Sequence, residues 1–275
     1  MSAPAPLRLR PLEIGDILDE TFRIYRRHFW LFAGISVIMA IPTAALTGYS
    51  FFTVFSSFLQ TINSINPDLN ALLPSLVWLA AGYLLSFLLS PFTVAAVIYA
   101  ACESALGRPV TIWGAVRGVL RRYFAILGYV FILDMMGVLF CLFPLWIWIV
   151  VGWVAVLPVM FVENGRLIAA MGRSWRLVEG RWWRTFLILL LVFLLWWLVG
   201  RALEGFLFFA TQIIGIVASN FLVVAIAQAI AVLVAALVNP VAQIAIVLVY
   251  FDLRVRREAL DLFQLAQRVS ATQPA

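Results

Sequence analysis

The chain contains six apolar runs of about the length needed to cross a lipid bilayer as helices. Spanning a hydrocarbon core takes about 20 apolar residues. The sequence is 65% apolar and 12% charged, whereas soluble domains average about 45–50% and 25%. We therefore predict an all-α, polytopic membrane protein. The predicted spans are Phe29–Phe52, Leu76–Cys102, Phe124–Phe143, Leu145–Val162, Thr185–Gly200 and Phe221–Phe251.

The arginines predict how this protein is oriented. With six spans, segments 1–28, 103–123, 163–184 and 252–275 share one side and hold 18 of the 19 basic residues, all of them arginine. Only Arg201 falls on the other side. Short basic segments stay cytoplasmic, so we expect three helical hairpins with both termini inside. The absence of lysine suits a GC-rich bacterial genome, which predicts the bacterial cytoplasmic (inner) membrane.

We expect a single integral membrane domain over residues 1–275. It comprises an interfacial N-terminal helix at 1–28, six spans within 29–251 and a cytoplasmic C-terminal helix and tail at 252–275. Residues 1–28 lack the short apolar core of a cleaved signal peptide, so we expect the N-terminus to be retained. Cys102 and Cys141 fall in different spans near opposite ends, which predicts unpaired thiols.

The segment Arg201–Asn220 is apolar enough to suggest a seventh span. A seventh span would move Arg254, Arg256 and Arg257 outside, against the arginine bias. We expect instead an outward continuation of the fifth helix, or an interfacial segment, ending near Ser219 and Asn220. The final helix is then about 30 residues long and able to tilt or protrude, with a kink predicted at Pro240.

Three inward-facing segments combine helical spacing with basic and aromatic residues. In Leu167–Val178 the apolar stripe is Leu167, Ile168, Met171, Trp175 and Val178, with Arg166, Arg173 and Arg176 off the stripe. This pattern predicts an amphipathic interfacial helix. Val110–Leu120 is a weaker example, and in the N-terminal segment Pro11 suits a first helical turn. There Glu13, Asp16, Asp19 and Glu20 precede Arg23, Arg26 and Arg27, which complements the helix dipole.

Gly180 is expected to end the helix of 167–178, and the following residues RWWR resemble an aromatic belt with arginines at headgroup depth. Arginine holds phosphate bidentately. We therefore predict a surface that binds lipid headgroups. Its candidate residues are Arg121, Arg122, Arg173, Arg176, Arg181, Trp182, Trp183 and Arg184.

The chain repeats itself at low resolution. The clusters RRHFW (26–30), RRYF (121–124) and RWWR (181–184) each precede a span. Each following hairpin returns on a helix that carries a proline and ends in an acid, namely Pro91 with Glu103, Pro158 with Glu163 and Pro240 with Asp252. The repetition indicates either duplicated units or hairpins that obey the same interface rules.

Three segments together resemble a known family: PLEIGDILDETFRIYRRHFW, RSWRLVEGRWWRTF and YFDLRVRREALDL. They are similar to the membrane domain attached to some bacterial glycerophosphodiester phosphodiesterases, a family that includes stand-alone six-helix proteins. In the fused members catalysis resides in a separate soluble barrel with metal-binding carboxylates and histidines. The resemblance implies a membrane domain without that barrel, so we do not expect its activity here.

No catalytic constellation is evident in the sequence. His28 is the only histidine and is expected to be an interfacial anchor. The N-terminal acids suggest a metal site, but Asp19 and Glu20 have pairing spacing to Arg23, and we expect no metal, cofactor or enzymatic activity.

Asp134 lies midway along the third predicted span, where an ionisable group is costly and by default a functional hypothesis. It is alternatively protonated, or bonded to Gln228, Asn239 or Gln243.

The sequence thus favours a non-enzymatic, multi-pass protein that binds or organises membrane lipids, anionic ones above all, at the inner face. It predicts no nucleic-acid partner and leaves a protein partner and homo-oligomers open. One alternative is a small transporter that uses Asp134, Pro91, Asn239 and Pro240, because proline frees backbone carbonyls within spans. Another is an enzyme that acts on glycerophospholipids, which only the family resemblance supports.

Overall fold

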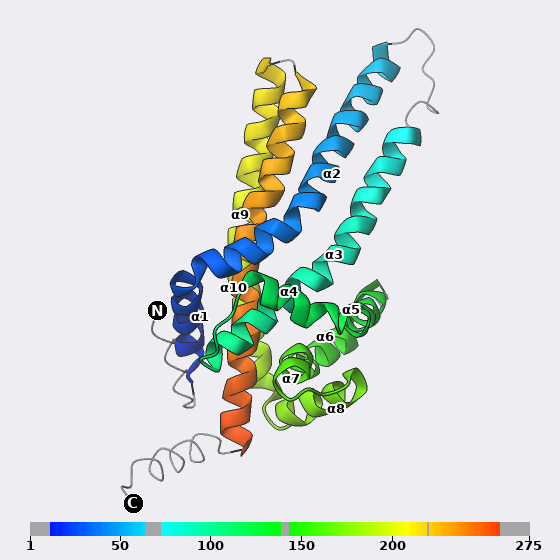
Figure 1. Cartoon of the computed structure of the whole chain (residues 1–275). Coiled ribbons are helices and arrows are strands. Elements are labelled where there is room, and N and C mark those ends of the chain that lie inside the picture. The colour runs from blue at the N-terminus through cyan, green and yellow to red at the C-terminus, as the bar shows by residue number, and fades with distance from the viewer. Residues whose placement is uncertain (1–11, 64–72, 139–142, 219, 259–275) are drawn as a thin grey trace, which may run out of the picture.

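The computed structural model describes residues 12–63, 73–138, 143–218 and 220–258, and this part of the chain is helical, without strands. Four long helices stand beside one another and six shorter ones gather toward one end of them (Figure 1). The long helices are α2 (Phe29–Asn63), α3 (Leu73–Ala105), α9 (Trp182–Ala218) and α10 (Phe221–Glu258). The short helices are α1 (Ile14–Arg27), α4 (Ile112–Leu120), α5 (Tyr123–Val138), α6 (Phe143–Gly152), α7 (Val156–Val162) and α8 (Leu167–Val178).

Five helical segments in the described part of the chain are long and apolar enough to cross a membrane. They are Phe29–Phe58, Leu73–Ala105, Pro144–Val162, Trp182–Ile213 and Phe221–Glu258. A sixth apolar helix, Tyr123–Gly137, is shorter. The all-α prediction is confirmed, and five of the six predicted spans correspond to helices of sufficient length.

The apolar side chains of the long helices face outward. In the apolar window of α9 only 11% of the residues are buried, and Phe206 and Phe209 are 71% and 68% exposed. An apolar surface of this extent is unfavourable in water. It is favourable against lipid tails, which agrees with a multi-pass membrane protein.

Helix α9 runs without a break from Trp182 to Ala218, so the segment after Arg201 continues the fifth predicted helix. Its 37 residues extend about 55 Å at 1.5 Å per residue, well beyond a hydrocarbon core of roughly 30 Å. Helix α10 is of similar length and contains Pro240. These helices must therefore tilt or extend past the core at one end.

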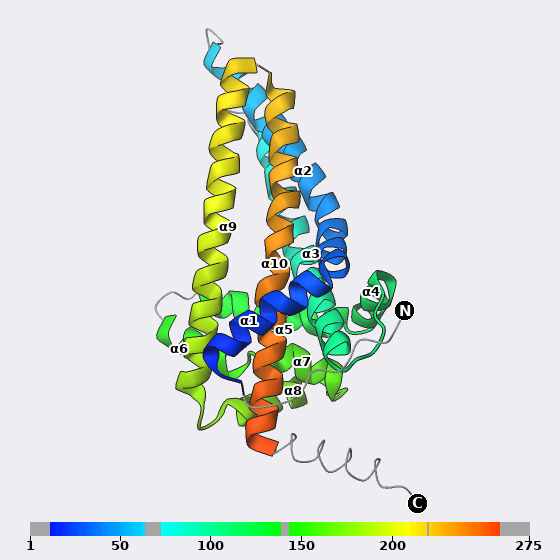
Figure 2. The ribbon, with the colours of Figure 1, turned by 90° about the vertical axis from the view of Figure 1, so that its left-hand side faces the viewer.

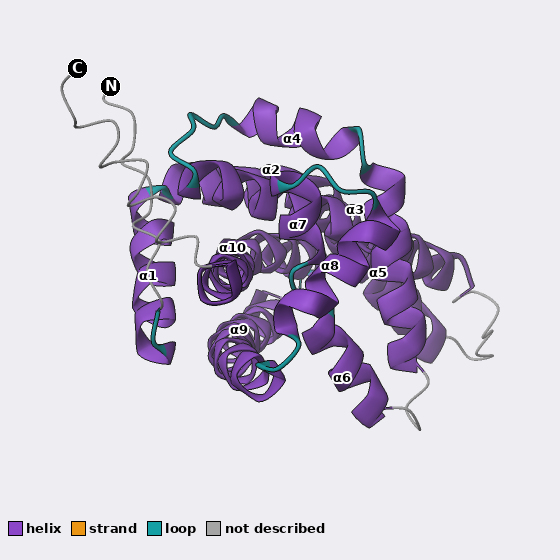
Figure 3. Ribbon diagram, turned by 90° about the horizontal axis from the view of Figure 1, so that it is seen from below, coloured by secondary structure: helices purple, strands orange, loops and turns teal. Residues whose placement is uncertain are grey.

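The short helices are not arranged as simple parallel hairpins. Seen along α9 and α10, α5 and α6 are viewed from the side and so lie across the long helices (Figure 3). Helix α1 likewise crosses α10 (Figure 2). Helices α6 and α7 are separated at Trp153–Ala155, where Ser174 Oγ donates to Gly152 O at 2.8 Å and accepts from Ala155 N at 3.1 Å. This hydroxyl satisfies backbone groups that the break leaves free.

The buried core lies among the short helices and the adjoining parts of α3, α9 and α10. Residues 156–161 of α7 are all buried, as are most residues from Ile244 to Val255 of α10. Helix α7 is therefore surrounded by protein, and the second half of the predicted span Leu145–Val162 faces the core.

The three amphipathic segments are helical, but the predicted face of 167–178 is rotated. Helix α8 buries Ala170, Ser174, Leu177 and Val178, whereas Ile168 of the predicted stripe is 84% exposed. The difference arises because α8 packs its small and apolar side chains on α7. Gly180, with a φ of +80°, follows the helix as predicted.

The N-terminal segment has the predicted charge order, with Asp16 in the first turn of α1 and Arg26 and Arg27 in the last. Cys102 is buried and free. Pro11, Cys141, Ser219 and residues 259–275 of the predicted C-terminal helix and tail lie outside the described residues.

Close packing of α2 against α10 generates a testable prediction. A Cβ at Gly48 would lie 2.8 Å from Ala225 O and 3.2 Å from the Cβ of Ala229, whereas nothing lies within 4 Å of a Cβ at Gly200. We expect Gly48→Ala to lower the free energy of unfolding by roughly 1–3 kcal/mol, because the α10 backbone must move. Thermal unfolding of the purified protein in detergent measures this effect. Gly200→Ala is the matched control, and equal stability of the two variants would contradict this packing.

Candidate functional site

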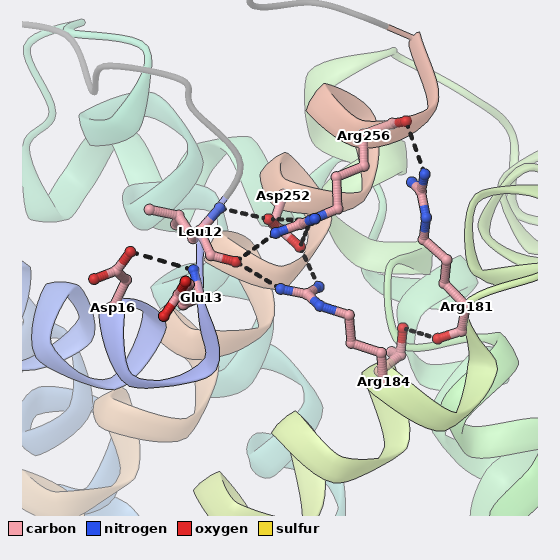
Figure 4. A network of polar contacts seen from close by, with 8 residues as sticks. Leu12, Glu13, Asp16, Arg181, Arg184, Asp252 and Arg256 are labelled. Carbon is pink, nitrogen blue, oxygen red and sulfur yellow. Dashed lines mark hydrogen bonds and ion pairs between the residues drawn. The ribbon is translucent and has the colours of Figure 1, made fainter.

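A buried carboxylate organises the end of the structure where the short helices gather. We call it the basic end, because the arginines of α1, α4, α8 and the last turns of α10 lie there. The Asp252 side chain is 1% exposed and lies near the end of α10 (Figure 4). Arg184 Nη1 donates to its Oδ2 at 2.5 Å, and Arg256 Nε donates to Oδ1 and Oδ2 at 2.9 and 3.1 Å. Two guanidinium groups thus compensate one buried carboxylate, which would otherwise be strongly destabilising.

The same two arginines hold the segment that precedes α1. Arg184 Nη2 and Arg256 Nη2 donate to Leu12 O at 2.6 and 2.7 Å, while Leu12 N donates to Asp252 Oδ1 at 2.9 Å (Figure 4). The start of α9, the end of α10 and the entry to α1 therefore meet at one point, although they are far apart in the sequence.

A second network joins α8 to the end of α10. Arg173 donates from Nε to Glu163 Oε2 at 3.1 Å and also pairs with Glu258. Arg254 Nε donates to Glu258 Oε2 at 3.0 Å, and Tyr250 Oη donates to Glu163 Oε1 at 3.0 Å. Burial alone would lower the pKa of Arg173, but the hydrogen bonds to Glu258 and Glu163 outweigh it and leave that pKa above its ordinary value. This network is balanced, with two arginines and two glutamates.

Two further arginines from the basic-aromatic clusters contact backbone carbonyl groups. Arg122 donates to Met160 O and, at 3.0 Å, to Asn164 Oδ1. Arg181 Nη2 donates to Arg256 O at 3.0 Å. Since Arg122 precedes α5 and Met160 lies in α7, this contact closes the α5–α7 hairpin at its base, as Arg184 and Asp252 close the α9–α10 hairpin.

The predicted headgroup-binding arginines thus fall into two groups. Arg122, Arg173, Arg181 and Arg184 are engaged in internal contacts. Arg121 and Arg176 are exposed and have no ion pair or side-chain hydrogen bond to a described residue. Four arginines outside the predicted headgroup-binding set are likewise exposed and have no such contact to a described residue, namely Arg26, Arg27, Arg117 and Arg166.

The predicted tryptophans also differ from each other. Trp182 stacks on Phe186 with centroids 5.2 Å apart and donates from Nε1 to Trp148 O at 3.2 Å, whereas Trp183 is 73% exposed. Three other aromatic side chains near exposed arginines are also highly exposed: Trp30 at 85%, Trp113 at 64% and Phe124 at 85%. Exposed aromatic and basic side chains therefore alternate along the basic end.

The residues proposed for transport are not brought together by any described contact. Asp134 is an exposed residue of α5 and has no hydrogen bond or ion pair to a residue that the structure describes. Asn239 Oδ1 instead accepts from Trp196 Nε1 at 3.3 Å, and Gln228 Nε2 donates to Thr211 Oγ1 at 3.0 Å. Pro91 and Pro240 are buried inside α3 and α10, and Gln243 Oε1 is buried without a partner among the described residues.

The described residues contain no group of three His, Cys, Asp or Glu side chains placed to hold a metal ion. Glu20 pairs with Arg23, and Asp16 accepts from Glu13 N at 3.2 Å. The pKa of His28 is lowered by burial and by the adjacent charge of Arg27. Compared with protein-family models, curated proteins and solved structures, the chain matches none of them.

The sequence analysis missed the partners that make some of these arginines internal. Asp252, Glu163 and Tyr250 are the chief ones. A signal was present, because Asp252 and Glu163 are the acids that end the returning helices of the repeat.

The role of Asp252 is testable by removing its charge. We expect Asp252→Asn to lower the free energy of unfolding by about 3 kcal/mol, since two half-buried guanidinium groups lose their counter-ion. Glu204→Gln is the control, because Glu204 is 42% exposed in its pair with Arg201 and should cost less than about 1 kcal/mol. Thermal unfolding in one detergent compares them. A small, equal loss in both variants would show that the Asp252 network does not hold the helices together.

Proposed function

We propose that this chain is a non-enzymatic, multi-pass protein of the bacterial cytoplasmic membrane that binds anionic lipid headgroups at its basic end. The observation that supports the proposal best is the set of exposed arginines without partners in the described structure. They are Arg26, Arg27, Arg117, Arg121, Arg166 and Arg176. Their charge is free to interact with anionic headgroups, whereas the charges of Arg173 and Arg184 are compensated by internal carboxylates.

The exposed aromatic side chains support the same proposal. Trp113 lies one helical turn before Arg117 on α4, and Phe124 follows Arg121 closely in the chain. Tryptophan and other aromatic rings are favoured at the membrane interface, where basic side chains reach the headgroups. Each arginine near an anionic leaflet contributes on the order of 1 kcal/mol. Several weak contacts then add up to preferential binding of anionic lipid.

We also propose the finer topology of six spans in three hairpins, with both termini cytoplasmic. The arginine bias supports the orientation, because 18 of the 19 arginines fall in the four segments assigned to the inner side. The α5–α7 hairpin most needs a test, because α5 has 16 residues, or about 24 Å, and lies across the long helices. A hairpin that returns to its starting side leaves the orientation of the termini unchanged whether or not it crosses fully.

The family relationship is likewise a proposal, supported by the three quoted segments alone. The transport and enzyme alternatives have no supporting contact among the described residues, so we propose neither.

The lipid proposal is tested with exposed arginines only. We expect the triple variant Arg117→Gln, Arg121→Gln and Arg176→Gln to retain less phosphatidylglycerol and cardiolipin, with up to about 3 kcal/mol of attraction lost. Quantification of copurified lipids by native mass spectrometry at matched salt gives the result, because surface charge effects are screened by salt. Arg201→Gln is the control, being exposed but distant from the basic end. Retention of anionic lipid at the wild-type level by the triple variant would refute the proposed function.

The topology is tested by labelling single cysteines in a background that lacks Cys102 and Cys141. Ala169→Cys on the exposed face of α8 should label only from inside, and Asn220→Cys between α9 and α10 only from outside. Met135→Cys, near the end of α5, should label from outside if α5 crosses the core. If Asn220→Cys labels from outside but Met135→Cys does not, α5 does not cross the core and the protein has fewer than six spans. External labelling of Ala169→Cys would contradict the proposed orientation.

A further inference from the structure

An open pocket of about 490 Å³ lies between the α8–α9 turn and the end of α10. It is lined by Glu179, Gly180, Arg181, Arg256 and Arg257. Three of the five lining residues are arginines and one is an acid, so the pocket lining carries a net charge of two positive units. Asp252 pairs with Arg256 and so offsets one positive charge of the lining, but Asp252 is also paired with Arg184, whose positive charge offsets that of the carboxylate.

Several guanidinium groups of this pocket have unused donors. Arg181 Nη1 is buried and has no hydrogen-bond partner in the described part of the chain, while its Nη2 donates to Arg256 O. Arg256 uses Nε and Nη2 on Asp252 and Leu12, which leaves its Nη1 without a partner among the described residues. A buried donor without a partner is destabilising, and an acceptor that reaches it removes this cost.

The pocket's own carboxylate compensates these charges poorly. Glu179 Oε2 lies 3.4 Å from Arg257 Nη2, and the Glu179 side chain is 65% exposed. Exposed pairs of this kind contribute little. Arg257 Nη1 is also held on Glu179 O at 2.9 Å, so its guanidinium is fixed at the pocket edge while its charge remains available.

From this arrangement we propose that the pocket formed by Arg181, Arg256 and Arg257 binds a phosphate group. Three arginines line this pocket, and guanidinium groups suit phosphate, which offers several acceptor oxygens to their planar donor forks. The phosphate belongs either to a lipid headgroup or to a free phosphate ester. The lipid form rests on the proposed function, whereas the pocket itself uses none of the six exposed arginines.

Glu179 provides a variant whose effect cannot be explained by misfolding. We expect Glu179→Gln to bind phosphate several-fold more tightly, because it removes the negative charge at the pocket. Arg257→Gln should bind roughly tenfold more weakly, as a charge-assisted hydrogen bond is lost. Arg257 is partly exposed, so this variant is expected to fold. Arg201→Gln, an exposed arginine outside the pocket and outside the proposed headgroup-binding set, is the matched control.

The experiment has two arms on the full chain. In the first, glycerol 3-phosphate is titrated into protein in a zwitterionic detergent at constant ionic strength, and binding is measured by calorimetry. In the second, retention of a single phosphatidylglycerol is measured by native mass spectrometry. The expected order of affinity is Glu179→Gln highest, then wild type and Arg201→Gln together, with Arg257→Gln lowest.

If the glycerol 3-phosphate titration gives this order of affinity, the ligand is a free phosphate ester. If only the phosphatidylglycerol measurement gives it, the ligand is a lipid headgroup. If neither arm shows this order, or if Arg201→Gln weakens binding as much as Arg257→Gln does, the pocket is not a phosphate site. The proposed function fails separately, through the exposed triple variant.

Discussion

The buried carboxylate of Asp252 is the interaction on which the basic end of the protein depends. It is 1% exposed and would be strongly destabilising without Arg184 and Arg256. Satisfying it requires the start of α9 and the end of α10 to meet, which closes their hairpin. Because both arginines also donate to Leu12 O, the entry to α1 is fixed at the same place. One charge thus determines how three distant segments are arranged.

This arrangement divides the arginines by role. Those beside the returning helices, such as Arg173 and Arg184, are compensated within the protein and stabilise it. Those on the outer faces of α1, α4 and α8 have no counter-ion among the described residues, so their charge is available to groups outside the protein. In the proposed topology both groups lie near cytoplasmic ends of spans, where positive charge favours that orientation. Only the exposed group is free to distinguish anionic from neutral lipids, which is why the proposed function rests on it.

The sequence predicts the helices well and the contacts between them poorly. The helical spacing of apolar residues over Leu167–Val178 and the break at Gly180 predicted the limits of α8. The arginine bias argued against a seventh span and favoured either a continued fifth helix or an interfacial segment, and the structure has the continuous helix α9. Local spacing contains no information on a partner 68 residues away, so Arg184 was predicted to face lipid although it pairs with Asp252. The exposure of Ile168 also depends on tertiary packing, because α7 supplies the surface against which α8 packs. The crosswise position of α5 is likewise a tertiary feature that local spacing does not predict.

The central claim is the division between internal and lipid-facing arginines, and residue-resolved modification by phenylglyoxal measures it directly. The protein is modified in nanodiscs of phosphatidylcholine and in nanodiscs containing phosphatidylglycerol, at matched salt. We expect Arg117, Arg121 and Arg176 to react rapidly in the neutral discs and to be protected in the anionic discs, while Arg173 and Arg184 react slowly in both. Rapid modification of Arg184 in the folded protein, or equal reactivity of Arg117, Arg121 and Arg176 in the two kinds of disc, would contradict the account.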